Sequence, residues 1–174
     1  MKKLAGLVVA IFLACGQSAF ADEYQGLHCG DDITKAMIGK RTVNAPIVEI
    51  EKKYRAIGLK NLGGDEISDN LSSVGSMICG SEYIELIDRK GIVRDALAFP
   101  QHSKTQPAFS GFCQVNGKDL PDVIVGVLDG SAAGDLLPVK TAWKIDQKQA
   151  KFVAISGEGV LCPRSGIYTV DGGK

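Results

Sequence analysis

Residues 1–21 constrain this chain more than any other part of it, because they have the composition of an export signal. Two lysines precede an apolar run over residues 4–14, and residues 19–21 (Ala-Phe-Ala) form a small-x-small cleavage site. The apolar run is shorter than the roughly 20 residues that span a bilayer. We therefore expect a signal peptide over 1–21 and a mature chain that folds in the periplasm or outside the cell.

Cys15 leaves a second route of export open. The sequence Leu13-Ala14-Cys15-Gly16 partly resembles a bacterial lipoprotein processing site, in which the cysteine becomes the lipidated first residue. Phe12 stands where such sites usually carry a small aliphatic residue, and the downstream cleavage site is well formed. We favour a free product over one that is lipid-anchored through Cys15.

Either route leaves the same four cysteines: Cys29, Cys79, Cys113 and Cys162. An even number of cysteines in a small exported chain predicts two disulfides, with three possible pairings. No two of them are close enough in sequence for a C-x(2–4)-C metal-ligand pair. We favour the sequential pairing Cys29–Cys79 and Cys113–Cys162, with the nested and crossed pairings as alternatives.

Length and charge indicate a single domain over residues 22–174. The full chain of 174 residues carries 20 basic and 20 acidic residues, and the leader removes two lysines and no acids. The mature chain is therefore slightly acidic, and no long block of one charge occurs in it. This pattern argues against nucleic acid or an anionic membrane as partner. No second apolar stretch approaches transmembrane length, so no transmembrane segment is expected in the mature chain.

Helical patterns are confined to the first third of the mature chain. Ile33, Ala36 and Met37 fall on one face of a short helix that an aspartate can cap. A second helix is predicted over residues 44–57, where the apolar residues recur at helical spacing and Gly58 follows. The alternation within residues 48–51 also allows a strand there.

Strand patterns dominate after residue 70, whereas residues 59–70 look like a loose connection with a Gly-Gly turn. Strands are predicted over 82–87, 92–99, 122–128, 142–146, 152–156, 160–162 and 167–170. Helices followed by strands with short connections predict an α+β fold, with N-terminal helices packed on an antiparallel β-meander and two disulfides.

The sequence contains no catalytic or cofactor motif. There is no nucleophile elbow and no phosphate-binding loop, and the Gly157-Glu158-Gly159 start of a dinucleotide loop lacks the strand–helix frame. His28 lies beside Cys29 and close to Asp31, where a solvated turn and helix cap explain it better than a metal site. We therefore expect no catalytic residues, no metal and no cofactor.

One segment has the composition of a recognition loop. Residues 99–112 contain two prolines, one histidine and three phenylalanines without regular periodicity, and Cys113 follows them. Exposed aromatic side chains are typical of binding surfaces. The candidate partner-binding residues are Phe99, His102, Lys104, Phe109 and Phe112, and we expect Phe109 and His102 to be at least partly exposed. The alternative is that the phenylalanines cover an open sheet edge.

These observations favour a small non-enzymatic binding protein of the periplasm or exterior, such as a protein inhibitor or an immunity-type factor. Its partner would be a protein or a ligand of the cell envelope. A structural envelope protein or lipoprotein is the first alternative. A hydrolase that works through carboxylates or His102 is the second.

Overall fold

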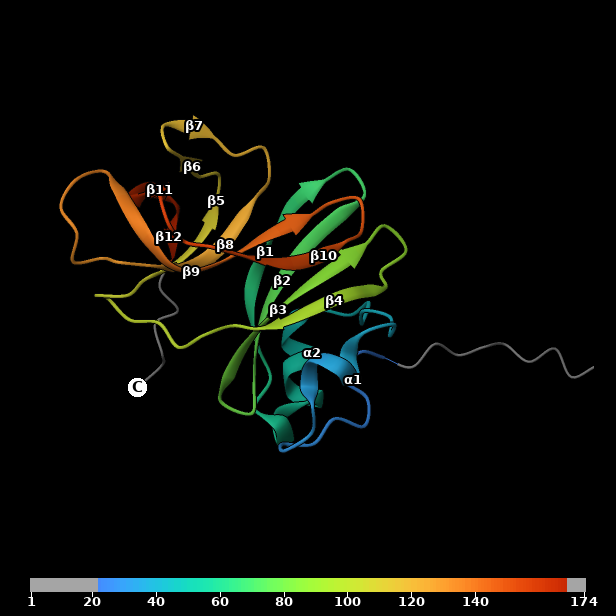
Figure 1. Cartoon of the computed structure of the whole chain (residues 1–174). Coiled ribbons are helices and arrows are strands. Elements are labelled where there is room, and N and C mark those ends of the chain that lie inside the picture. Colours follow the sequence, from blue (N-terminus) through green and yellow to red (C-terminus); the bar gives the residue numbers. More distant parts are fainter. Residues whose placement is uncertain (1–21, 169–174) are drawn as a thin grey trace, which may run out of the picture.

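The computed structural model describes residues 22–168, and Figure 1 shows how their elements are arranged. The export signal predicted over 1–21 lies outside the described residues. The helical elements are α1 (Ile33–Met37), α2 (Ile47–Lys53), and the 3-10 helices η1 (Arg55–Ile57) and η2 (Arg164–Gly166). The strands are β1 (Lys60–Ser68), β2 (Leu71–Ile78), β3 (Ser81–Asp88), β4 (Val93–Ala98), β5 (Ala108–Gly111), β6 (Gln114–Val115), β7 (Lys118–Asp119), β8 (Ile124–Leu128), β9 (Leu136–Asp146), β10 (Lys151–Ile155), β11 (Val160–Pro163) and β12 (Ile167–Tyr168).

The first sheet is an antiparallel meander in the order β1-β2-β3-β4. The two inner strands, β2 and β3, pair along their whole length, from Leu71 opposite Asp88 to Ile78 opposite Ser81. Tight connections join successive strands, so each hairpin aligns side chains of neighbouring strands on a common face.

The second sheet has the order β12-β5-β8-β9-β11-β6-β7, and β10 pairs with β9 outside this path. Its organising element is β9, which is 11 residues long. The amino-terminal part of β9 pairs with β11, while its carboxyl-terminal part pairs with β8 on one side and β10 on the other. All pairs in this sheet are antiparallel.

Both faces of the first sheet carry buried apolar side chains. On β3, Tyr83 and Ile87 pack in a cluster with Ile33 and Met37 of α1. The intervening residues Ile84 and Leu86 point the opposite way, into a cluster shared with strands β5, β8 and β9. Because side chains alternate along a strand, β3 separates two cores and is itself almost entirely buried.

The two disulfides join Cys29 to Cys79 and Cys113 to Cys162. This is the sequential pairing favoured from the sequence. The first bridge ties the segment before α1 to the end of β2, and the second ties the segment after β5 to β11. Each bridge therefore closes a loop within its own half of the chain, which restricts the unfolded state.

The predicted α+β arrangement requires correction, because helices make up little of the chain. The helices α1 and α2 have five and seven residues, and strands form two antiparallel sheets rather than one meander. The helix predicted over 44–57 is shorter: α2 starts after Pro46 and is followed by η1. Among residues 22–168, no helix combines the length and the apolar character needed to cross a bilayer.

Strand β1 was missed because it lies in the region predicted as a loose connection, and β2, which follows that region, was also missed. β1 is largely exposed and polar, so it lacks the apolar alternation of a half-buried strand. The Gly63-Gly64 pair lies inside β1, where a break in the pairing register with β2 accommodates Gly63 at a φ of 98°. The glycine pair that predicted a turn therefore forms part of a bulge in an edge strand.

Candidate ligand cavity

The predicted recognition loop does not form as expected. Residues 108–111 belong to β5, which pairs with β8 and β12. The Phe109 side chain is fully buried, and Phe99 is buried in the core between the sheets. The expectation that Phe109 is exposed was therefore wrong, because alternation along β5 turns it into a core.

His102 also has an interior role. Its Nε2 lies 2.7 Å from Oε2 of Glu82, and the two side chains are 11% and 6% exposed. The Tyr168 hydroxyl donates to the other oxygen of Glu82 at 3.4 Å, and the His102 ring contacts the rings of Phe99 and Tyr168. This cluster connects β3, the 99–107 segment and β12. Of the five candidate residues, only Lys104 and Phe112 lie on the surface, and Phe112 is 62% exposed.

A cavity of about 310 Å³ lies between α2 and the helix-facing side of the first sheet. Its apolar wall comes from α2, the segment before it, the residue before β1, and strands β2 and β3: Val43, Ala45, Ile47, Ile50, Leu59, Val74 and Ile87. Its remaining lining residues are Glu23, Tyr24, Thr42, Glu51, Asn61 and Ser72. Ala45 and Ile47 are exposed, so they mark its mouth, whereas Leu59 and Ile87 are buried at its base.

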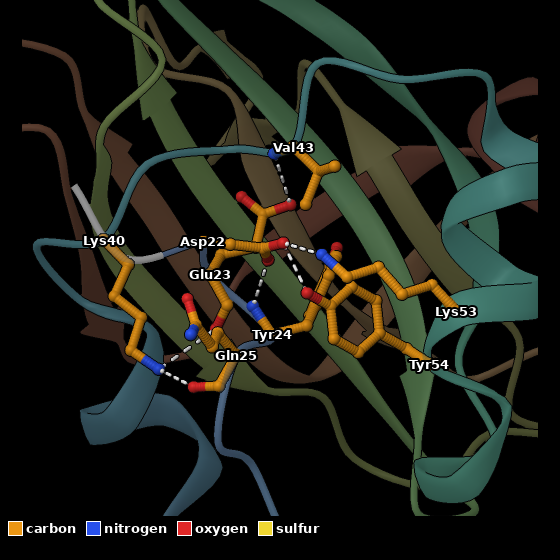
Figure 2. Close-up of polar contacts among 8 residues, drawn as sticks. All are labelled: Asp22, Glu23, Tyr24, Gln25, Lys40, Val43, Lys53 and Tyr54. Atoms are coloured by element: carbon orange, nitrogen blue, oxygen red, sulfur yellow. Dashed lines mark hydrogen bonds and ion pairs between the residues drawn. The ribbon is translucent and has the colours of Figure 1, made fainter. Parts of the chain in front are cut away.

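The segment Asp22–Leu27, here called the N-terminal segment, brings Glu23 to this cavity. The Glu23 N–H donates to the Arg41 carbonyl at 3.0 Å, and the Lys40 ammonium donates to the Gln25 carbonyl at 2.8 Å. Tyr24 and Leu27 are buried in the core beneath α1. Figure 2 shows the segment held between the chain around Val43 and the helix that carries Lys53.

Asp22 fastens this segment to the end of α2. Its Oδ2 lies 2.9 Å from the Lys53 ammonium and accepts a hydrogen bond from the Tyr54 hydroxyl (Figure 2). Although burial raises the pKa of Asp22, the hydrogen bonds from Tyr54 and Lys53 outweigh it and hold that pKa below the usual value. Asp22 is therefore an ionised anchor, with its hydrogen-bonding capacity engaged.

Glu23 differs from Asp22 in having few partners. Its Oε1 accepts one long hydrogen bond, from the Val43 N–H at 3.4 Å, and its Oε2 is buried without a hydrogen-bond partner. Only 5% of the residue is exposed. A buried carboxyl oxygen without a donor is unfavourable unless the group is protonated or a ligand supplies the donor.

A second buried carboxyl, Glu85 on β3, lies behind the first. Glu85 is fully buried, and its Oε1 accepts from the Tyr24 hydroxyl at 3.4 Å while its Oε2 has no partner. The Tyr24 hydroxyl also lies 3.3 Å from Oγ of Ser76, which is fully buried on β2. Tyr24 thus stands between the two glutamates.

Burial sets the protonation of this pair. It raises the pKa of Glu23 to about 7, with the Val43 N–H and the Tyr24 hydroxyl acting in the opposite direction. It raises the pKa of Glu85 to about 8, and the negative charge of Glu23 adds to that rise. Burial and the two carboxylates also raise the pKa of Tyr24, so its hydroxyl stays a donor. The cavity therefore contains a carboxyl that changes charge near neutral pH.

Other parts of the described chain are less suited to hold a ligand. A larger cavity of about 470 Å³ lies between the β1–β2 and β3–β4 turns, but four of its five charged lining residues, Asp65, Glu66, Asp69 and Arg89, are exposed to solvent. His28 is exposed, and Asp31 accepts its backbone N–H in a turn, as predicted. Within residues 22–168 no three His, Cys, Asp or Glu side chains are grouped to hold a metal ion.

Sequence reasoning missed Glu23 and Glu85 for different reasons. Glu23 lies in the polar stretch directly after the leader, which resembles an ordinary solvated start of a mature chain. Glu85 carried a usable signal, because it interrupts the apolar run of residues 83–87 on the face that Tyr83 and Ile87 define. A carboxyl at a core-facing strand position indicates either a partner or a function.

Comparisons with protein-family models, curated proteins and solved structures find no match. Function is therefore inferred from the geometry of this chain alone.

Proposed function

We propose that this protein is an exported, non-enzymatic binding protein that holds a small amphipathic ligand in the cavity between α2 and the first sheet. The observation that carries the proposal is that Glu23, whose Oε2 is buried without a hydrogen-bond partner, lines a cavity that has an extensive apolar wall. Ligand sites typically combine apolar walls with a few polar groups that fix orientation. The volume of about 310 Å³ suits a ligand at the small end of that class.

The surroundings of the cavity support this proposal. The N-terminal segment, α2 and the sheet are held together by the Asp22 contacts and by the Cys29–Cys79 bridge, so the walls are preformed. Preformed walls lower the entropy cost of binding. The apolar side chains of Ile47 and Val48 are exposed at 52% and 76%, which places an apolar surface beside the mouth.

The location outside the cytoplasm remains part of this proposal. Two disulfides suit an oxidising compartment, and the composition of residues 1–21 suits an export signal. The cavity in turn replaces the 99–112 segment as the proposed binding surface, because Phe99, His102 and Phe109 are committed to the interior.

A blocking substitution at the mouth tests the proposal. Ala45→Trp adds a large side chain at an exposed lining position, whereas Val48→Trp adds the same side chain on α2 outside the lining. Amide chemical shifts are recorded while n-hexanol is titrated. We expect saturable shifts confined to cavity residues in the wild type and in Val48→Trp, and their loss in Ala45→Trp. Shifts that are absent from the wild type, or unchanged in Ala45→Trp, would contradict the proposal.

A further inference from the structure

The charged groups that line the cavity are of one sign. Glu23 and Glu51 are its ionisable carboxyls, and no lysine, arginine or histidine occurs among its lining residues. Glu51 is engaged, since its Oε1 accepts the Asn61 N–H at 2.9 Å, whereas Oε2 of Glu23 accepts nothing. The electrostatic potential inside is therefore favourable to a cation and unfavourable to an anion.

The two lysine ammoniums near Glu23 are bonded to other groups. By element, the ionisable neighbours are Asp22 and Tyr24 of the N-terminal segment, the α-ammonium that cleavage after Ala21 would leave on Asp22, Lys40 and Arg41 of the link before α2, Glu51 of α2 and Glu85 of β3. The Lys40 ammonium donates to the backbone carbonyls of Gln25 and Glu23 instead of to the carboxyl. The Lys53 ammonium is engaged by Asp22.

We propose that the ligand of this cavity is a small primary amine, bound as its ammonium ion, with the ammonium on Oε2 of Glu23 and the hydrocarbon against the apolar wall. This inference rests on the proposed function and assigns the chemical class of the ligand. An ammonium has three donors and no acceptor, so it matches a carboxylate oxygen that lacks a donor. Hydrogen bonds between such ions are roughly twice as strong as neutral ones.

Binding of an ammonium is linked to ionisation of Glu23. The protonated carboxyl has to release its proton to solvent before the charge-assisted bond forms, so near neutral pH binding releases protons. The raised pKa of Glu23, about 7, places this exchange in a measurable range. The affinity for an ammonium should therefore rise about tenfold between about pH 6 and about pH 8, following the ionised fraction.

Calorimetric titration with n-hexylammonium and n-hexanol tests the inference, because the two probes share a chain and differ in the head group. At about pH 8 we expect n-hexylammonium to bind about tenfold more tightly than n-hexanol. Glu23→Gln should remove that advantage while the affinity for n-hexanol stays unchanged. Equal affinities of the two probes, or an unchanged ammonium affinity in Glu23→Gln, would overturn the inference.

Glu85→Gln provides a matched control. Glu85 does not line the cavity, and because its pKa is raised further than that of Glu23, it is still mostly protonated when Glu23 ionises. This substitution should therefore leave the preference for n-hexylammonium close to that of the wild type. Loss of the preference in Glu85→Gln to the same extent as in Glu23→Gln would show that the preference does not come from the Glu23 carboxylate.

The two proposals fail in distinguishable ways. If n-hexanol binds in the cavity and n-hexylammonium binds no better, the binding function stands and the amine class is wrong. If neither probe is affected by Ala45→Trp, the cavity is not a binding site and both proposals are wrong. Thermal unfolding of Glu23→Gln provides the folding control, since a buried neutral amide replaces a buried acid.

Discussion

Strand β3 carries one buried glutamate on each face, and the two differ in their hydrogen-bond partners. Glu82 points to the side of the second sheet, where His102 and Tyr168 contact its two oxygens. Glu85 points to the helix side, where one oxygen accepts from Tyr24 and the other has no partner. The two residues are similarly enclosed, so burial alone does not explain the difference.

We infer from this difference that Glu82 has a structural role, whereas Glu85 belongs to the candidate functional site. The Glu82 carboxyl, with His102 on one oxygen and the Tyr168 hydroxyl on the other, joins β3 to the 99–107 segment and to β12, and both of its oxygens have partners. The Glu23–Glu85 pair is two acids with one phenol between them, which costs stability whenever both are ionised. Such uncompensated groups are characteristic of sites where stability is given up for binding.

The largest expected change in stability follows from substitution of Glu82, the glutamate whose two oxygens both have partners. Glu82→Ala leaves His102 and Tyr168 without their shared hydrogen-bond partner, and buried polar groups left without a partner cost about 3 kcal/mol. We expect the urea midpoint at neutral pH to fall accordingly. Glu66→Ala, at an exposed position on β1, is the matched control and should change stability little. An unchanged urea midpoint in Glu82→Ala would contradict the structural role inferred for Glu82.

The pH dependence of stability reports on Glu23 and Glu85, the two carboxyls on the helix side of the first sheet. Glu23 and Glu85 have raised pKa values, about 7 and about 8 against a usual 4.5, so the folded state binds more protons than the unfolded state between these limits. Stability should therefore be greatest near pH 4.5, fall as the pH rises to about 8, and then level off. We expect the urea midpoint to fall progressively over this range.

The double variant Glu23→Gln/Glu85→Gln serves as the control for this profile, because amides do not titrate. Its stability should be nearly flat over the same range. A wild-type stability that rises between about pH 5 and about pH 8 would contradict the assignment of the two carboxyls.

Glu85→Gln alone should stabilise the protein, which is the opposite sign to Glu82→Ala on the same strand. At about pH 8 the variant avoids the cost of a buried negative charge, and we expect a gain of about 2 kcal/mol. At about pH 4.5 the wild-type carboxyl is protonated and the gain should vanish. Chemical denaturation at the two pH values measures both; destabilisation at the higher pH would show that Glu85 has a partner that compensates its charge.

The smallest effect is expected at His28. Its contact with Asp31 is exposed, whereas the contact of His102 with Glu82 is buried. His28 lies 3.6 Å from an Asp31 oxygen, but its side chain is 81% exposed. We expect His28→Ala to change the free energy of unfolding by less than about 0.5 kcal/mol and to leave the metal content unchanged. Elemental analysis and urea unfolding measure both, and stoichiometric metal lost on substitution would overturn this reading.

Much of the secondary structure was predictable, because local pattern determines it. The Ile33–Met37 helix with its Asp32 cap, and the cores of strands β3, β4 and β8, follow from apolar spacing and capping chemistry. The favoured cysteine pairing is also the one in the structure. Strands β1, β2 and β5 were missed because their positions in the sheets, and not local alternation, make them strands.

The sequence by itself determined the four cysteines available for bridging, the start of the first helix and the strand-rich second half. Only the tertiary structure decided which face each side chain meets. Phe109 was assigned to a surface loop, yet β5 places it in a core. Glu23 and Glu85 are 62 positions apart and meet through Tyr24 only because the N-terminal segment packs across the first sheet. Burial and charge compensation are long-range properties, so no local pattern reports them.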